Sequence, residues 1–116
     1  MSKFKFGNSI VKIEIEDLIF RIEITQQLRE KMTASSQKMR EVRAEINELS
    51  EREKEEKIIP VFDNAIDEIL GAGSSEKIFS DRKSDAYERI AVYLFVCDEI
   101  NKQCYEIKAK ANEETV

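Results

Sequence analysis

The stretch from Gln26 to Lys57, QQLREKMTASSQKMREVRAEINELSEREKEEK, decides how this chain folds. Its apolar residues recur at alternating spacings of four and three, which is the a/d pattern of a helix that lies against another helix. We call this row the seam, and its members are Leu28, Met32, Ser35, Met39, Val42, Ile46 and Leu49. The pattern predicts one long, coiled-coil-like helix over residues 26–57, with Thr25 as its N-cap.

The seam has two interpretations, and they are compatible. It packs inside the chain against the helix predicted over residues 84–109, or it pairs with another chain as a coiled coil. A serine and two methionines in so short a seam make a weak autonomous coiled coil, whereas methionine suits a surface that adapts to partners. The candidate partner or self-association surface comprises Leu28, Met32, Met39, Val42, Ile46 and Leu49.

The first 24 residues alternate between apolar and polar side chains. This period of two, with many β-branched and aromatic residues, predicts strands that bury one face. Turn-forming residues at Gly7–Ser9 predict a hairpin there, and Glu16–Asp17 marks a second connection. We therefore expect an antiparallel hairpin or a three-stranded meander over residues 1–24.

Pro60 predicts a break in the helical pattern. Proline disfavours helix at the residue before it and suits the first turn of a new helix. We therefore expect a kink near residues 58–60 and a second helix over residues 60–71, closed by Gly71 or Gly73.

The last third of the chain predicts a short turn over residues 74–80 and a third helix over residues 84–109. A frayed tail is expected over residues 110–116. The apolar face predicted for the third helix comprises Tyr87, Ile90, Leu94, Cys97, Ile100 or Asn101, Cys104 and Ile107. Around residues 91–97 the helix is apolar almost all round, which indicates the centre of the core.

These elements predict a single α+β domain over residues 1–116. A small N-terminal antiparallel hairpin or three-stranded meander packs on three helices, the first of them long. The composition agrees, because 37% of the 116 residues are charged and 41% apolar, with only three glycines and one proline. That profile is typical of a helix-rich folded chain rather than a disordered one.

Few residues point to chemistry. The chain has no histidine, which removes the commonest general base and metal ligand. The acids Asp63, Asp67 and Glu68 are typical of a solvated helix face. The glycines at 71 and 73 lack both Gly-x-Gly-x-x-Gly and Gly-Lys-Ser/Thr, so they indicate a helix cap and a turn. We therefore expect a protein that is not an enzyme, with no catalytic residue, cofactor, metal or small-molecule substrate.

The net charge and the cysteines limit which classes of partner and which cellular compartment are expected for this chain. The net charge of −5 disfavours nucleic acid, whose phosphates require clustered Lys and Arg. Cys97 and Cys104 lie seven residues apart in a helical pattern, about 10 Å, which is too far for a disulfide. No run is long and apolar enough to span a membrane, and no secretion signal is evident. We therefore expect a cytoplasmic protein with no membrane partner.

The stretch from Pro60 to about Gln103 resembles small proteins of the tail-morphogenesis modules of long-tailed phages and prophages of Gram-positive bacteria. The matching motif is Phe62-Asp63-Asn64-Ala65-Ile66-Asp67-Glu68-Ile69-Leu70-Gly71-Ala72-Gly73 followed by Ser74-Ser75-Glu76-Lys77-Ile78-Phe79. The start, Phe4-Lys5-Phe6-Gly7-Asn8-Ser9-Ile10, also resembles the N-terminal hairpin of that group. The resemblance implies a tail assembly chaperone or a related tail accessory protein, of the kind that coats the tape-measure protein while the tail tube polymerises. The motif is structural, so no functional residue carries over.

The leading hypothesis is a non-enzymatic protein that self-associates and masks apolar helical surface of a tape-measure-type client, in the cytoplasm of the bacterial host. The expected partners are therefore a protein client and further copies of the chain. Two alternatives stay open: a coiled-coil dimerising structural or adaptor protein unrelated to phage, and a small nucleic-acid-associated regulator.

Overall fold

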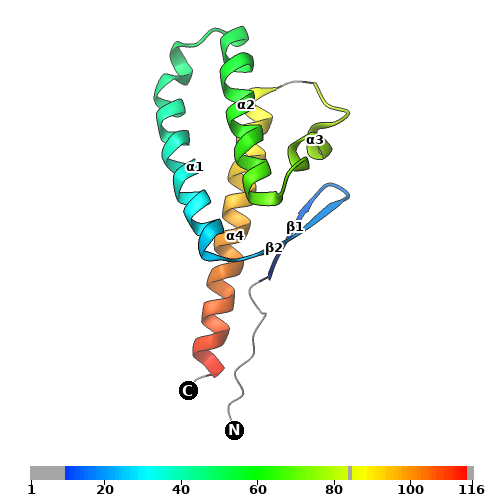
Figure 1. Cartoon of the computed structure of the whole chain (residues 1–116), viewed down its shortest axis with the longest axis vertical. Coiled ribbons are helices and arrows are strands. Elements are labelled where there is room, and N and C mark those ends of the chain that lie inside the picture. Colours follow the sequence, from blue (N-terminus) through cyan, green and yellow to red (C-terminus); the bar gives the residue numbers. More distant parts are fainter. Residues whose placement is uncertain (1–9, 84, 115–116) are drawn as a thin grey trace.

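A computed structural model describes residues 10–83 and 85–114, with side-chain surroundings as far as Tyr105. It confirms an α+β fold in which a two-stranded antiparallel hairpin precedes a layer of helices (Figure 1). The elements are β1 (Ile10–Ile15), β2 (Leu18–Glu23), α1 (Gln26–Glu45), the 3-10 turn η1 (Ile46–Glu48), α2 (Glu51–Leu70), α3 (Ser74–Phe79) and α4 (Ala86–Glu114).

The predicted alternation of the hairpin is confirmed. The ladder pairs Val11 with Ile22 and Ile13 with Phe20, so these four apolar residues share one face. Val11 and Ile13 are fully buried. The chain reverses at residues 16–17, where Glu16 has a φ of 52° in the left-handed region. The further hairpin predicted at residues 7–9 lies outside the described residues.

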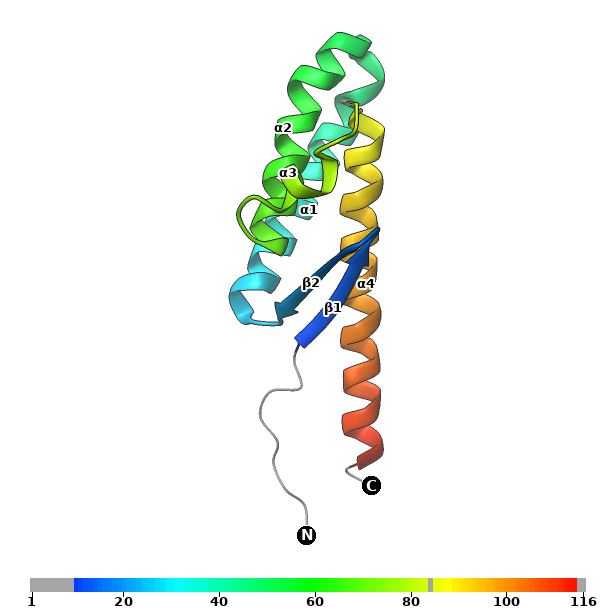
Figure 2. The same ribbon diagram turned by 90° about the vertical axis from the view of Figure 1, so that its right-hand side faces the viewer.

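A side chain of α4 holds the free edge of β1. The Gln103 amide donates to the Lys12 carbonyl over 2.7 Å and accepts from the Lys12 N–H over 3.1 Å. It thus satisfies the two backbone groups that a third strand would otherwise pair. Figure 2 shows the hairpin lying beside α4, at an angle to it. The burial of Val11 and Ile13 turns the apolar face of the hairpin toward the helices.

The prediction of one helix over residues 26–57 is wrong, because the chain turns back within it. Thr25 does cap α1, accepting the Leu28 N–H over 3.1 Å, but α1 ends at Glu45. After the 3-10 turn, Ser50 begins α2 with a capping box in which its side chain and that of Glu53 satisfy each other's backbone N–H groups. The Ser-x-x-Glu spacing directly after the last seam residue, Leu49, is a helix-start signal.

The break predicted near residues 58–60 is also absent. The second helix predicted over residues 60–71 instead begins at Glu51, and Pro60 lies inside it. Pro60 is exposed, so the backbone carbonyl that it leaves without a donor faces the solvent side. Its neighbours Ile58 and Phe62 are only 1% and 3% exposed, and their burial holds the helix through the proline.

The C-terminal half follows the predicted order with one shift in phase. Gly71 ends α2 at a φ of 115°, and α3 is a six-residue helix that buries Phe79. α4 continues to Glu114, past the predicted end at residue 109. Its buried stripe comprises Ala86, Arg89, Tyr93, Val96 and Ile100, one position before the predicted face. Tyr87 and Leu94 of the predicted face are exposed, whereas Ile90, Cys97 and Cys104 remain partly buried against the core. The helix is therefore rotated by less than one residue position from the expected orientation.

Candidate functional site

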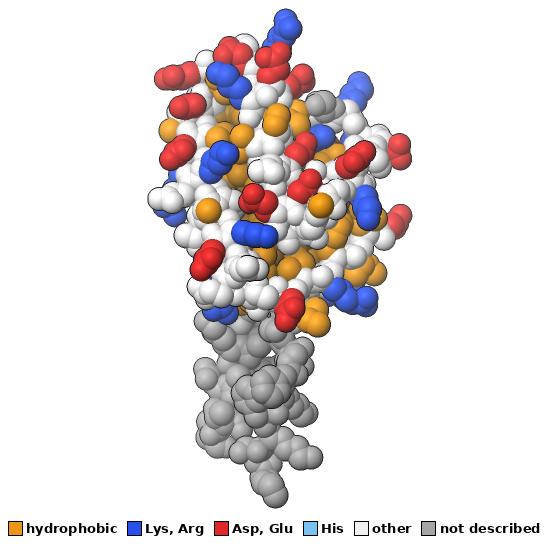
Figure 3. All heavy atoms as spheres, in the orientation of Figure 1, with side chains coloured by type: hydrophobic (Ala, Val, Ile, Leu, Met, Phe, Trp, Pro, Cys, Tyr) orange, Lys and Arg blue, Asp and Glu red, His pale blue; other side chains and the backbone are white. Residues whose placement is uncertain are grey.

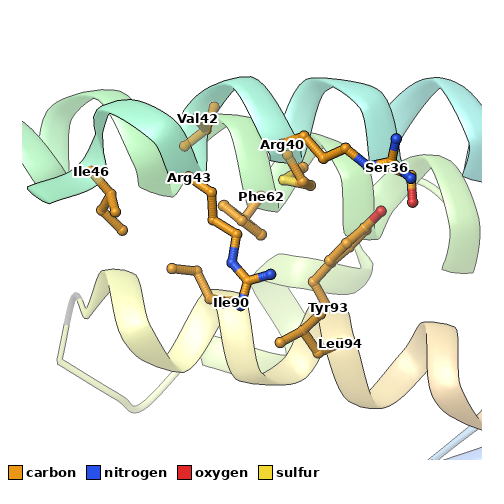
Figure 4. A pocket seen from close by; sticks show the side chains of 10 residues that line it. Ser36, Arg40, Val42, Arg43, Ile46, Phe62, Ile90, Tyr93 and Leu94 are labelled. Atoms are coloured by element: carbon orange, nitrogen blue, oxygen red, sulfur yellow. The ribbon is translucent and has the colours of Figure 1, made fainter.

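A groove runs between α1 and α4. It exists because α1 packs mainly on α2, and α2 in turn on α4, so the two outer helices are separated along much of their length. Its deepest part is a cavity of about 160 Å³ (Figure 4). The apolar residues that line it are Met39, Val42, Ile46, Phe62, Ile90, Tyr93 and Leu94.

The groove continues toward the N-terminal end of α1. A second, more open hollow of about 400 Å³ adjoins the first and shares Ser36 and Arg40 with it. Met32, Thr33 and Asn101 line its far part. The two hollows together form an elongated channel whose floor is apolar near Phe62 and more polar near Asn101. This shape fits an extended segment or a helix rather than a small compact ligand.

One buried hydrogen bond joins the two walls at the base of the groove. The hydroxyls of Ser35 and Tyr93 lie 2.7 Å apart, and both residues are buried. Ser35 also donates to the Met32 carbonyl over 3.0 Å. Burial raises the pKa of the Tyr93 phenol, so its hydroxyl keeps its proton. The single polar residue of the seam is therefore explained by a partner on α4.

The rim on the α1 side is basic. Arg40 and Arg43 are exposed, and neither forms an ion pair with any residue whose side chain is described. Figure 4 shows the Arg43 side chain reaching across the mouth of the groove toward Ile90. An occupant that carries acidic groups beside its apolar face would thus meet positive charge at this edge.

The seam residues face the core of the same chain. Leu28 and Met39 are buried, and Met32, Val42, Ile46 and Leu49 are half-buried against the core. This placement supports the intramolecular interpretation of the seam. The predicted partner is wrong in part, because α1 packs mainly on α2, and the helix predicted over residues 84–109 contributes the Tyr93 contact with Ser35. Met39, Val42 and Ile46 nevertheless line the groove, so one edge of the predicted partner surface remains accessible.

The sequence interpretation missed the apolar surface on the outside of α4. Leu94 and Phe95 are 44% and 43% exposed, and Ala91 beside them is also exposed. The available signal was the stretch over residues 91–97, which is apolar almost all round. That stretch predicted the centre of the core, but one side of it faces outward. It therefore carries surface as well as core.

The acidic residues near the end of α2 have structural partners. Asp63 accepts from the Arg89 Nε over 3.4 Å, and the guanidinium of Arg89 stacks 3.9 Å from the centre of the Phe79 ring. Burial raises the pKa of Asp63 even though Arg89 opposes the shift. Asp67 accepts the Ser75 N–H over 2.8 Å and so caps α3. These contacts tie α2, α3 and α4 together.

Other features of the described residues point to no site. They contain no group of three potential metal ligands, and none of their helices is long and apolar enough to cross a membrane. Cys97 and Cys104 are half-buried free thiols. Figure 3 shows acidic and basic side chains interspersed over the face that α1 and α2 form, with no large area of one sign. The groove is thus the main candidate for a binding site.

A family model described as a family of unknown function (DUF6673) matches residues 11–115. The match spans nearly the whole chain, and the chain belongs to this family. No curated protein and no solved structure matches it.

Proposed function

We propose that this member of the DUF6673 family is a non-enzymatic assembly chaperone that binds an apolar helical segment of a protein client in the groove between α1 and α4. The observation that carries the proposal is the groove itself, because its floor of Val42, Ile46, Phe62 and Ile90 is apolar and open at the surface. Recognition of an amphipathic helix by an apolar groove is a common mode of protein binding.

The chemistry of the groove defines the client helix. Its apolar side would lie on the floor, and acidic residues beside that stripe would meet Arg40 and Arg43 on the rim. Binding would remove the client's apolar surface from water and so prevent its aggregation before assembly. Such masking is what a tape-measure-type client would need while a tail tube polymerises around it.

The resemblance to phage tail proteins gives this proposal its biological context. Its motif maps onto the end of α2, the turn at Gly71 and Gly73, and α3. Both glycines adopt positive φ, and Phe62, Ile66 and Ile69 of the motif are buried. Phe62 of the motif lies on the groove floor, so the segment that carries the resemblance also contributes to the proposed client site.

Fluorescence anisotropy with labelled helical peptides tests the proposal. The peptides would tile any long coiled-coil protein that is found to be encoded in the gene neighbourhood of this chain. Binding by peptides with an apolar stripe flanked by acids is expected, and Ile90→Gln in the groove should weaken it at least about tenfold. Ile19→Gln on the outer face of the hairpin, where Ile19 is 54% exposed, is the matched control.

Two outcomes of the same assay would contradict the proposal. Absence of binding by every peptide would refute the client assignment. Binding that Ile90→Gln leaves unchanged would show that the client uses another surface. Circular dichroism of both variants separates a loss of binding from a loss of folding.

A further inference from the structure

An exposed apolar face on α4 adjoins the groove and has no partner among the described residues. It consists of Ala91, Leu94 and Phe95, with Asp98 one turn beyond Leu94. Leu94 belongs to both surfaces, because it lines the groove and is 44% exposed. The groove and the face thus form one continuous apolar area. Continuous exposed apolar area of this kind marks an interaction site.

We propose that α4 of a second copy of this chain covers this area. The two α4 helices would run antiparallel and cross at Leu94, so that each lies over the α1–α4 groove of the other. A two-fold axis makes such a contact isologous, which means that one patch has to complement itself. This patch does so, because it offers both an apolar ridge and an adjoining apolar groove.

The charges fit the same arrangement. The two α4 helices of an antiparallel pair that crosses at Leu94 run in opposite directions. The residue four positions after Leu94 in one copy therefore lies level with the residue four positions before Leu94 in the other copy. Asp98 of the second copy therefore lies level with Ile90. Figure 4 shows Arg43 reaching over Ile90, so Asp98 and Arg43 of different copies come together twice in the pair. Within the described residues of one chain, neither Asp98 nor Arg43 has an ion-pair partner.

This pairing moves self-association from the seam, where the sequence predicts it, to the outer face of α4. It also uses the groove to which the proposed function assigns the client. A second copy would thus close the groove until a client helix displaces it. The pairing itself does not depend on the client, so each proposal can fail without the other.

Sedimentation equilibrium of the full chain over a wide concentration range tests the pairing. The average mass should rise from 13.5 kDa toward twice that value as concentration increases. Leu94→Glu should keep the chain monomeric, whereas Ile19→Glu, at a similarly exposed position on the hairpin, should not. A mass of 13.5 kDa at every concentration would overturn the inference. A dimer that persists in Leu94→Glu but is lost in Ile19→Glu would overturn it as well.

Charge reversal provides a test at exposed positions, where folding is not at risk. Arg43→Glu and Asp98→Arg should each raise the dimer dissociation constant at least about tenfold. The double variant should restore it, because both pairs then form with opposite polarity. Lys38→Glu is the control, because Lys38 lies on α1 like Arg43 but does not line the groove. Failure of the double variant to recover affinity would overturn the proposed pairing.

Discussion

Replacing Ser35 by leucine separates the two interpretations of the seam. In a coiled coil, leucine at this position would complete the apolar row and strengthen pairing between chains. In the structure Ser35 is only 7% exposed and its hydroxyl lies 2.7 Å from that of Tyr93. Leucine there would remove the hydrogen bond and would also have to fit into space that a much smaller side chain fills. We therefore expect Ser35→Leu to destabilise the monomer.

The size of the effect follows from these two contributions. The Tyr93 hydroxyl, in a residue 3% exposed, would lose its partner at a cost of about 1–3 kcal/mol. Overpacking adds about 1–3 kcal/mol. A total of about 2–6 kcal/mol would lower the melting temperature by about 8–24 °C in a chain of this size.

Urea unfolding followed by circular dichroism measures this change, with the oligomeric state checked in parallel. Ala34→Leu is the matched control, because Ala34 is exposed on the same helix and lines neither hollow, so the change should alter the free energy of unfolding by no more than about 0.5 kcal/mol. If Ser35→Leu proves more stable than the natural chain and forms dimers, the buried placement of the seam is wrong.

Three further predictions concern helix continuity, the chain reversal and alkaline pH. Pro60→Ala should stabilise the chain by about 1–3 kcal/mol, because it restores a donor inside α2; a lower melting temperature would contradict this. Ser50→Ala should cost about 1 kcal/mol in urea unfolding by removing the capping box, and an unchanged midpoint would mean that the cap contributes nothing. Burial raises the pKa of the Cys97 thiol, so the folded chain holds this proton more tightly than the unfolded chain. The free energy of unfolding should therefore fall as pH rises above 9.0, and Cys97→Ala should reduce that slope in melting curves; an unaltered slope would exclude this thiol as a cause.

Local patterns predicted several features correctly because neighbouring residues decide them. The alternation of Val11 and Ile13 with charged residues places the buried face of β1, whatever the rest of the chain does. Thr25 caps α1 and Gly71 ends α2, since each supplies a backbone or side-chain property that few residues share. The seam was also correct as the row that α1 buries.

The errors arose where two local signals conflict or where a pattern is ambiguous. The seam runs on to Leu49, past the end of α1, while Ser50 and Glu53 form a capping box that starts a new helix. At Pro60 the local preference for a break is outweighed by burial of Ile58 and Phe62. On α4 nearly every position over residues 91–97 is apolar, so periodicity could not define which side faces inward.

The sequence alone determined the alternation of the two strands, the start of α1 and its buried row, and the end of α2, because alternation, period and caps act over a few residues. Only the tertiary structure decided that α1 and α2 fold back on each other, that Tyr93 reaches Ser35, and that Leu94 and Phe95 face outward. Those outcomes depend on how whole helix faces fit together, since burial of one face sets the rotation of every residue on that helix. The candidate site is a product of this fit: the groove exists because α1 rests mainly on α2 and leaves its edge toward α4 uncovered.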